Sequence, residues 1–142
     1  MARSGRYLAR RCAVQALYQW KVTGQATSEI ESSFIRNDNL YGRHLEYFLH
    51  LINNIPGNAE ILDDILSPHL DRTLENVDLV ERAILWLGTY ELKFQPDIPV
   101  NVVIDEAIDL AKTFGSEHGY KYVNGVLDKV AKEVRNDSPS PV

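Results

Sequence analysis

Residues 3–20, RSGRYLARRCAVQALYQW, join a basic head to an apolar stripe. A helix advances by about 100° per residue, so one face of this stretch would hold Ala9, Ala13, Ala16, Leu17 and Trp20. Arg3, Arg6 and Arg10 would fall along the edge beside that face. The pattern predicts a first helix whose apolar face anchors the fold and whose basic edge is available to an anion.

The charge of the chain is unevenly distributed. Its 142 residues include 15 Lys and Arg and 20 Asp and Glu, which gives a net charge of −5. No acidic residue precedes Glu29, whereas the same stretch contains Arg3, Arg6, Arg10, Arg11 and Lys21. A cationic segment on an otherwise acidic protein favours electrostatic contact with nucleic acid. The alternative, a frayed and solvated terminus, stays open at this point.

The composition is typical of a soluble globular protein, with 44% hydrophobic and 25% charged residues. The length fits one domain, or two small halves that share a core. The sequence has no apolar run long enough to span a bilayer and no apolar signal-peptide segment at its start, which predicts a cytoplasmic protein without membrane contact. Cys12 is the only cysteine, so an intrachain disulfide and a Cys-rich zinc site are excluded.

Apolar residues recur at helical spacing through the rest of the chain, and the alternation typical of strands is almost absent. We therefore predict an all-α fold of about seven helices around a shared core, with no sheet. We place these helices in one domain, residues 1–135, followed by a disordered tail at 136–142. The most apolar segment, Val77 to Leu92, is expected at the centre of the packing.

Local signals mark several helix ends. Gly24 predicts a left-handed residue that ends the first helix, and Gly115 predicts the same for the sixth. Ser28, followed by Glu31, predicts a capping box at the start of the second helix. Pro99 is expected to open the sixth helix, because proline is tolerated at that position.

Patterns typical of enzymes are absent from the sequence. It contains no phosphate-binding loop, dinucleotide fingerprint or zinc-binding His-Glu-x-x-His helix. Asp105, Glu106 and Asp109 cluster on one predicted helix, but nothing in the sequence places a nucleophile or metal beside them. We therefore predict no catalytic residues, no metal site, no cofactor and no enzymatic activity.

A second polar cluster lies at the start of the last predicted helix. Residues 114–125, FGSEHGYKYVNG, combine a glycine-framed turn with Tyr120, Lys121 and Tyr122. Helix N-termini favour phosphates, and exposed aromatic faces stack on unpaired bases. The alternative is that the tyrosines are half-buried and that Gly125 serves close helix packing.

Three ordered motifs, ARRCAVQALY at residues 9–18, FG at 114–115 and YVNGVLD at 122–128, resemble the NusB family of bacterial transcription antitermination factors. The segment from Pro99 to Lys112 is also similar, and the resemblance spans essentially the whole chain except its tail. It implies an all-helical fold of two packed small helical bundles, at roughly residues 1–72 and 73–135. It also implies that the protein binds boxA RNA through the arginine-rich segment. It also implies a heterodimer with the small ribosomal-subunit protein NusE, which joins RNA polymerase and protects ribosomal RNA transcription from termination.

The resemblance, together with the basic head, assigns residues to two surfaces. The expected RNA contacts are Arg3, Arg6, Arg10, Arg11, His118, Lys121 and Tyr122, and the expected NusE contacts are Tyr18, Glu75 and Glu81. Two other functions remain open: a helical protein–protein adaptor without RNA binding, and an accessory RNA-binding domain of the kind found in ribosomal RNA methyltransferases. A homodimer of the free protein is left open as well.

Overall fold

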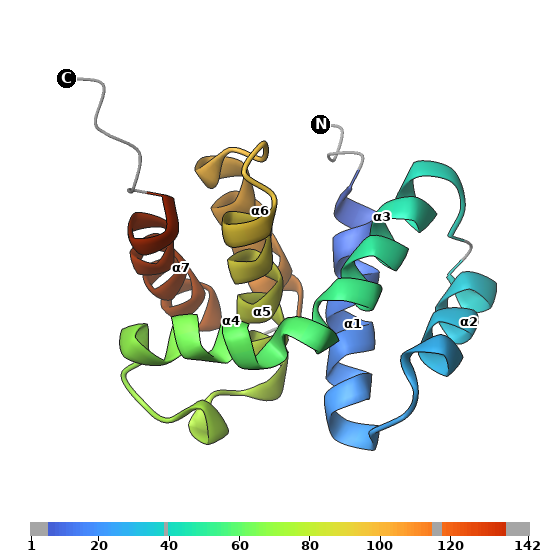
Figure 1. Ribbon diagram of the computed structural model, residues 1–142, viewed down its shortest axis with the longest axis horizontal. Helices are drawn as coiled ribbons and strands as arrows, with labels where there is room; N and C mark the ends of the chain where they lie inside the picture. Colours follow the sequence, from blue (N-terminus) through green and yellow to red (C-terminus); the bar gives the residue numbers. More distant parts are fainter. Residues whose placement is uncertain (1–5, 39, 115–117, 136–142) are drawn as a thin grey trace. The chain divides into compact units, whose positions relative to one another are not determined.

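A computed structural model describes residues 6–38, 40–114 and 118–135. Within these ranges the chain forms seven α-helices and three short 3-10 helices, with no strand (Figure 1). The predicted all-α class is therefore confirmed. The chain divides into two compact units, residues 1–58 and 59–142, which are described separately below.

The first unit contains α1 (Tyr7–Thr23), α2 (Thr27–Asn37), α3 (Gly42–Asn54) and the short η1 (Pro56–Asn58). The apolar stripe of α1 forms its core, because Ala9, Ala13, Ala16 and Leu17 are fully buried, and α3 packs against α1. Trp20, which we expected in the same stripe, is only half-buried. As predicted, Gly24 ends α1 in the left-handed conformation (φ 70°), and its N–H donates to the Trp20 carbonyl at 3.0 Å.

The predicted capping box at the start of α2 is wrong. The residue before the helix is Ala26, whose carbonyl accepts from the backbone N–H groups of Glu29 and Ile30, and no side chain caps the helix. Ser28 therefore lies inside the first turn, where its own carbonyl accepts a hydrogen bond from the Ser32 hydroxyl at 3.1 Å. The motif had the right spacing but stood too far along the helix to meet free N–H groups.

The second unit contains α4 (Ala59–Leu66), η2 (Ser67–His69), η3 (Leu74–Asn76), α5 (Leu79–Phe94), α6 (Val100–Phe114) and α7 (Gly119–Arg135). Every residue of α5 from Glu81 to Leu92 is buried, and α6 and α7 pack against it, which confirms the predicted central helix. The Asp78 carboxylate caps α5 by accepting from the N–H groups of Val80 and Glu81 at 3.1 and 3.2 Å.

A polar cluster fixes α4 to α5. The carboxylate of Asp63 accepts from the Trp86 indole N–H at 2.7 Å and from the Arg82 guanidinium at 3.2 Å. Because these contacts tie α4 to the second unit, the division of the chain falls between residues 58 and 59, earlier than the expected 72 and 73.

Arg135, the last residue of α7, binds backbone carbonyls at the C-terminal end of α5. The Arg135 guanidinium donates to the backbone carbonyls of Leu92 at 2.8 Å, Gln95 at 3.0 Å and Glu91 at 3.1 Å, and also to that of Ile98. The final carbonyls of a helix have no partner within the helix and carry partial negative charge, so a cation is favourable there. The predicted cap at Gly115 and the predicted tail at 136–142 lie outside the described residues.

Candidate nucleic-acid interface

The start of α1 carries the basic residues of the first unit. Arg6 directly precedes the helix and is half-buried, with its guanidinium carbon 4.4 Å from the centre of the Tyr47 ring in α3. Arg11 is also half-buried. Within the described ranges neither guanidinium forms an ion pair with a carboxylate. Arg3 lies outside those ranges.

Arg10 is not at the surface that the helical pattern predicted for it. Its side chain is only 2% exposed, and its guanidinium carbon lies 5.7 Å from the same Tyr47 ring. The edge of α1 that holds Arg10 faces α3, and the packing of these two helices buries the residue. Arg6 and Arg11 are thus the described arginines of the basic head that remain accessible.

The N-terminus of α1 adds positive potential of its own. Its first turn contains no acidic residue, and no side chain in the described part of the chain caps its N–H groups. Free N–H groups at a helix start attract anions, and the helix dipole acts in the same direction. Arg6 and the first turn of α1 therefore form a small region suited to a phosphate.

The predicted second cluster lies in the other unit, at the start of α7. His118 and Lys121 are exposed, and Tyr120 and Tyr122 are both half-buried. The Tyr120 ring is covered on one side by Lys112 of α6, whose ammonium lies 4.8 Å from the ring centre. The accessible groups at this helix start are therefore the imidazole of His118 and the ammonium of Lys121.

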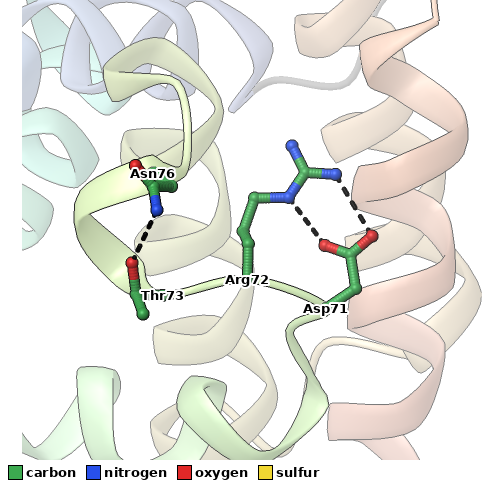
Figure 2. A network of polar contacts seen from close by, with 4 residues as sticks. All are labelled: Asp71, Arg72, Thr73 and Asn76. Atoms are coloured by element: carbon green, nitrogen blue, oxygen red, sulfur yellow. Dashed lines mark hydrogen bonds and ion pairs between the residues drawn. The ribbon is translucent and has the colours of Figure 1, made fainter.

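Tyr122 contacts a loop that the sequence did not connect with it. The guanidinium carbon of Arg72 lies 4.4 Å from the centre of the Tyr122 ring. Arg72 is held in turn by Asp71, with hydrogen bonds of 2.6 and 3.2 Å, and Asn76 donates to Thr73 at 3.0 Å in the same loop (Figure 2). One face of the Tyr122 ring is thus covered, so a stacking base would have only the other face.

Burial and neighbouring charged groups shift the pKa values of Tyr122 and Asp71. Burial raises the pKa of the Tyr122 phenol, with Arg72 opposing this effect and Asp71 adding to it. Hydrogen bonding from Arg72 lowers the pKa of the exposed Asp71 carboxyl. The Tyr122 hydroxyl oxygen is buried and has no hydrogen-bond partner among the described residues. These features are typical of a tyrosine that is packed against its neighbours.

The expected protein-binding residues differ in their exposure. Tyr18 is 41% exposed and lies beside Val22 at a shallow hollow between α1 and α2, whose other lining residues include Phe34. Glu75 in η3 is exposed, whereas Glu81 is only 7% exposed. Tyr18 belongs to the first unit and the two glutamates to the second. Glu75 is therefore the better placed of the two acidic side chains to meet a partner.

Two residues of these surfaces were missed from the sequence, namely Tyr47 and Arg72. Each contributes one side of an aromatic–guanidinium contact whose other side is distant in the chain. No local motif marks such a pair, because the contact exists only when two elements pack together.

In residues 6–38, 40–114 and 118–135, no group of three or more His, Cys, Asp or Glu side chains is arranged to hold a metal ion. None of the helices in this part of the chain combines the length and the apolar character needed to cross a bilayer.

Comparison with known proteins identifies close relatives. The model of the NusB family matches residues 8–132. The transcription antitermination protein NusB of Alcanivorax borkumensis is 49% identical over 132 residues, which cover 93% of this chain and 88% of that protein. The structure of T. maritima NusB matches with a TM-score of 0.85 at 33% identity, covering 96% of this chain and 97% of the other.

A further match contains a protein partner and a nucleic acid. It is a crystal structure of the antitermination factors NusB and NusE in complex with double-stranded RNA. The matched chain has a TM-score of 0.83 at 30% identity, and the match covers 90% of this chain and 96% of the other.

Proposed function

Because the chain belongs to the NusB family, we propose that it is a transcription antitermination factor that binds boxA RNA together with NusE. In this role it joins the antitermination complex of RNA polymerase and supports transcription of ribosomal RNA. It acts by binding and not as an enzyme, in the cytoplasm where bacterial RNA is made. A relative named as a transcription antitermination protein and a similar structure that contains NusE and RNA support the proposal.

The observation that carries the RNA-binding role is the presence of two accessible arginines, Arg6 and Arg11, at the start of α1. Arg6 and Arg11 are accessible, neither has a carboxylate partner in the described ranges, and the first turn of α1 has no acidic residue. Phosphate contacts by such cations supply most sequence-independent RNA affinity. We further propose that Arg3, His118, Lys121 and Tyr122 contribute to RNA binding, and that buried Arg10 contributes through its charge alone.

The proposed NusE contacts are Tyr18, Glu75 and Glu81. Tyr18 is an exposed aromatic side chain at a shallow hollow that is lined by Val22 and Phe34 together with polar side chains, which suits it as an anchor for a protein partner. Glu75 supplies an exposed negative charge that complements a basic ribosomal protein.

A salt titration of RNA binding tests the proposal. The wild type and the double variant Arg6→Ala/Arg11→Ala are titrated with single-stranded boxA RNA and with a scrambled RNA. Losing two phosphate contacts should flatten the log–log salt dependence by about 1.4 units, at roughly 0.7 per phosphate. Both RNAs should weaken by similar factors if the arginines contact only phosphates.

The control variant is Lys93→Ala, which removes an exposed charge at the far end of α5. It should leave the salt dependence unchanged. An unaltered slope in the double variant would remove the basic head from the RNA interface. A wild type that binds NusE but no RNA at low salt would instead support the adaptor function.

A further inference from the structure

The ring of Tyr47 in α3 contacts two arginine side chains at the start of α1. The guanidinium carbons of Arg6 and Arg10 lie 4.4 and 5.7 Å from its centre, and the His50 ring stacks beside it with 5.9 Å between ring centres. Tyr47 itself is 8% exposed, and its neighbour Phe48 is fully buried in the core. The ring is therefore a fixed part of the first unit and not a mobile surface group.

Stacking sets the direction in which Arg6 can bind. A guanidinium that lies on an aromatic face keeps its N–H donors pointing outward around its rim, where they can meet phosphate oxygens. In the described part of the chain no carboxylate competes for the donors of Arg6. The contact with the Tyr47 ring thus holds the Arg6 side chain without using its N–H donors.

Fixing the side chain before binding improves affinity. A free arginine loses most of its rotamer freedom when it grips a ligand, and that loss weakens binding. Arg6 precedes the first helical residue, so the helix itself does not order the side chain. The contact with the buried ring of Tyr47 supplies this order instead.

Two further features make the same place attractive to an anion. The guanidinium of Arg10 also lies near the Tyr47 ring, so a second positive charge is present at the ring that holds Arg6. The first turn of α1, which no side chain in the described part of the chain caps, begins at Tyr7, the next residue along the chain. A phosphate bound by Arg6 would therefore also interact with Arg10 and with the helix N-terminus.

We propose that Tyr47 is a positioning residue of the RNA site, which holds Arg6 in the orientation that receives an RNA phosphate at the start of α1. This role rests on the proposed RNA-binding function. Tyr47 does not contact the RNA, and its effect passes through Arg6.

The test compares Tyr47→Phe with Tyr47→Leu. The phenylalanine keeps the aromatic face, so RNA affinity should stay within about twofold of the wild type. Leucine fills much of the same space but offers no π face, and RNA binding should weaken by about three- to tenfold, the range expected for loss of a cation–π contact. Affinity for NusE, measured in parallel, should be the same for all three proteins and shows that they are folded.

A double-mutant cycle separates positioning from other effects. On the Arg6→Ala background, Tyr47→Leu should cause no further loss of RNA affinity, because the group that it positions is gone. An equal loss on both backgrounds would overturn the proposal, as would a Tyr47→Phe variant as weak as Tyr47→Leu.

A spectroscopic readout tests the Arg6 contact without RNA. In the wild type and in Tyr47→Phe, the NMR signal of the Arg6 Nε–H should carry a ring-current shift that Tyr47→Leu abolishes. Absence of that shift in the wild type would overturn the proposal even if RNA binds. If the shift is present but the wild type binds no RNA, the proposed function fails while the Arg6–Tyr47 contact stands.

Discussion

Gly88 of α5 lies so close to Leu127 of α7 that a β-carbon on the glycine would fall 2.7 Å from Leu127 Cδ1. Both residues are buried, Leu127 completely. The two helices can therefore approach each other only because residue 88 has no side chain. The sequence suggested Gly125 for this role, but Gly125 is exposed and a β-carbon there would meet nothing within 4 Å.

Alanine substitutions at these two glycines should have opposite effects on stability. Gly88→Ala should lower the free energy of unfolding by on the order of 1 kcal/mol, because overpacking costs about 1 to 3 kcal/mol and helix propensity returns about 1. Gly125→Ala should raise it by roughly 0.5 to 1 kcal/mol, since it gains propensity without a clash. Urea unfolding of both variants measures the difference, and equal stabilisation would show that Leu127 moves aside freely.

Arg10 should matter to folding far more than its neighbour Arg11. Removing the 2%-exposed side chain of Arg10 leaves a cavity, so Arg10→Ala should lower the free energy of unfolding by roughly 2 to 5 kcal/mol, as for other large buried side chains. Arg11→Ala, at a half-exposed position, should stay within about 0.5 kcal/mol. Thermal unfolding distinguishes the two, and similar melting temperatures would contradict the burial of Arg10.

The acidic residues proposed to bind NusE can be ranked by charge reversal. Glu75→Lys should weaken NusE binding by about 1 kcal/mol, mainly through slower association, and Glu75→Gln by less, because only lysine adds repulsion. Glu81→Lys should cost more than Glu81→Gln for the same reason, and it should also destabilise the fold, because Glu81 is 7% exposed. Binding kinetics at two salt concentrations provide the measurement. If neither lysine variant alters NusE affinity, the proposed partner surface is wrongly placed.

Tyr122 has a covered face and a face that remains for a base. If it stacks on RNA, Tyr122→Ala should lose about 1 to 3 kcal/mol of RNA binding, while Tyr122→Phe should keep most of it. The phenylalanine also removes a hydroxyl that is buried without a partner in the described residues, so its stability should not fall. RNA titration of both variants decides the matter. Unchanged RNA affinity in a folded Tyr122→Ala protein would leave Tyr122 only the role of holding Arg72.

The thiol of Cys12 gives a pH-dependent prediction. Burial raises its pKa from 9.0 to about 11. The charge of Asp38 adds a smaller increase, and the charge of Arg11 opposes it. The unfolded chain therefore loses the proton first as pH rises, so this group stabilises the fold fully below pH 9 and its contribution declines between pH 9 and about 11. The free energy of unfolding, measured across this range, should decline less steeply with pH in Cys12→Ala than in the wild type. Rapid thiol labelling of the native protein at pH 8 would contradict the burial.

Features written in local sequence were predicted well. The run from Val77 to Leu92 is apolar on nearly every side, and only a central position can bury such a helix. Gly24 ends α1 because its backbone adopts a positive φ that other residues avoid. The basic head was visible because no acidic residue interrupts it.

Features that depend on packing partners were not predictable in the same way. The helical pattern placed Arg10 on an edge, but which edge becomes covered depends on the position of α3. The contacts of Tyr47 with Arg6 and of Tyr122 with Arg72 join distant segments and leave no spacing signal. The start of α2 at Thr27 shows that a well-spaced capping motif can still be out of register with its helix.

Arg135 links the end of α5 to the residues that follow it. Its guanidinium donates to the carbonyls of Glu91 and Leu92 in α5 and to those of Gln95 and Ile98 beyond the helix. One side chain of α7 thus holds two neighbouring segments at once. A local opening of the last turn of α7 would release both of them together, so their amide protons should share one hydrogen-exchange rate.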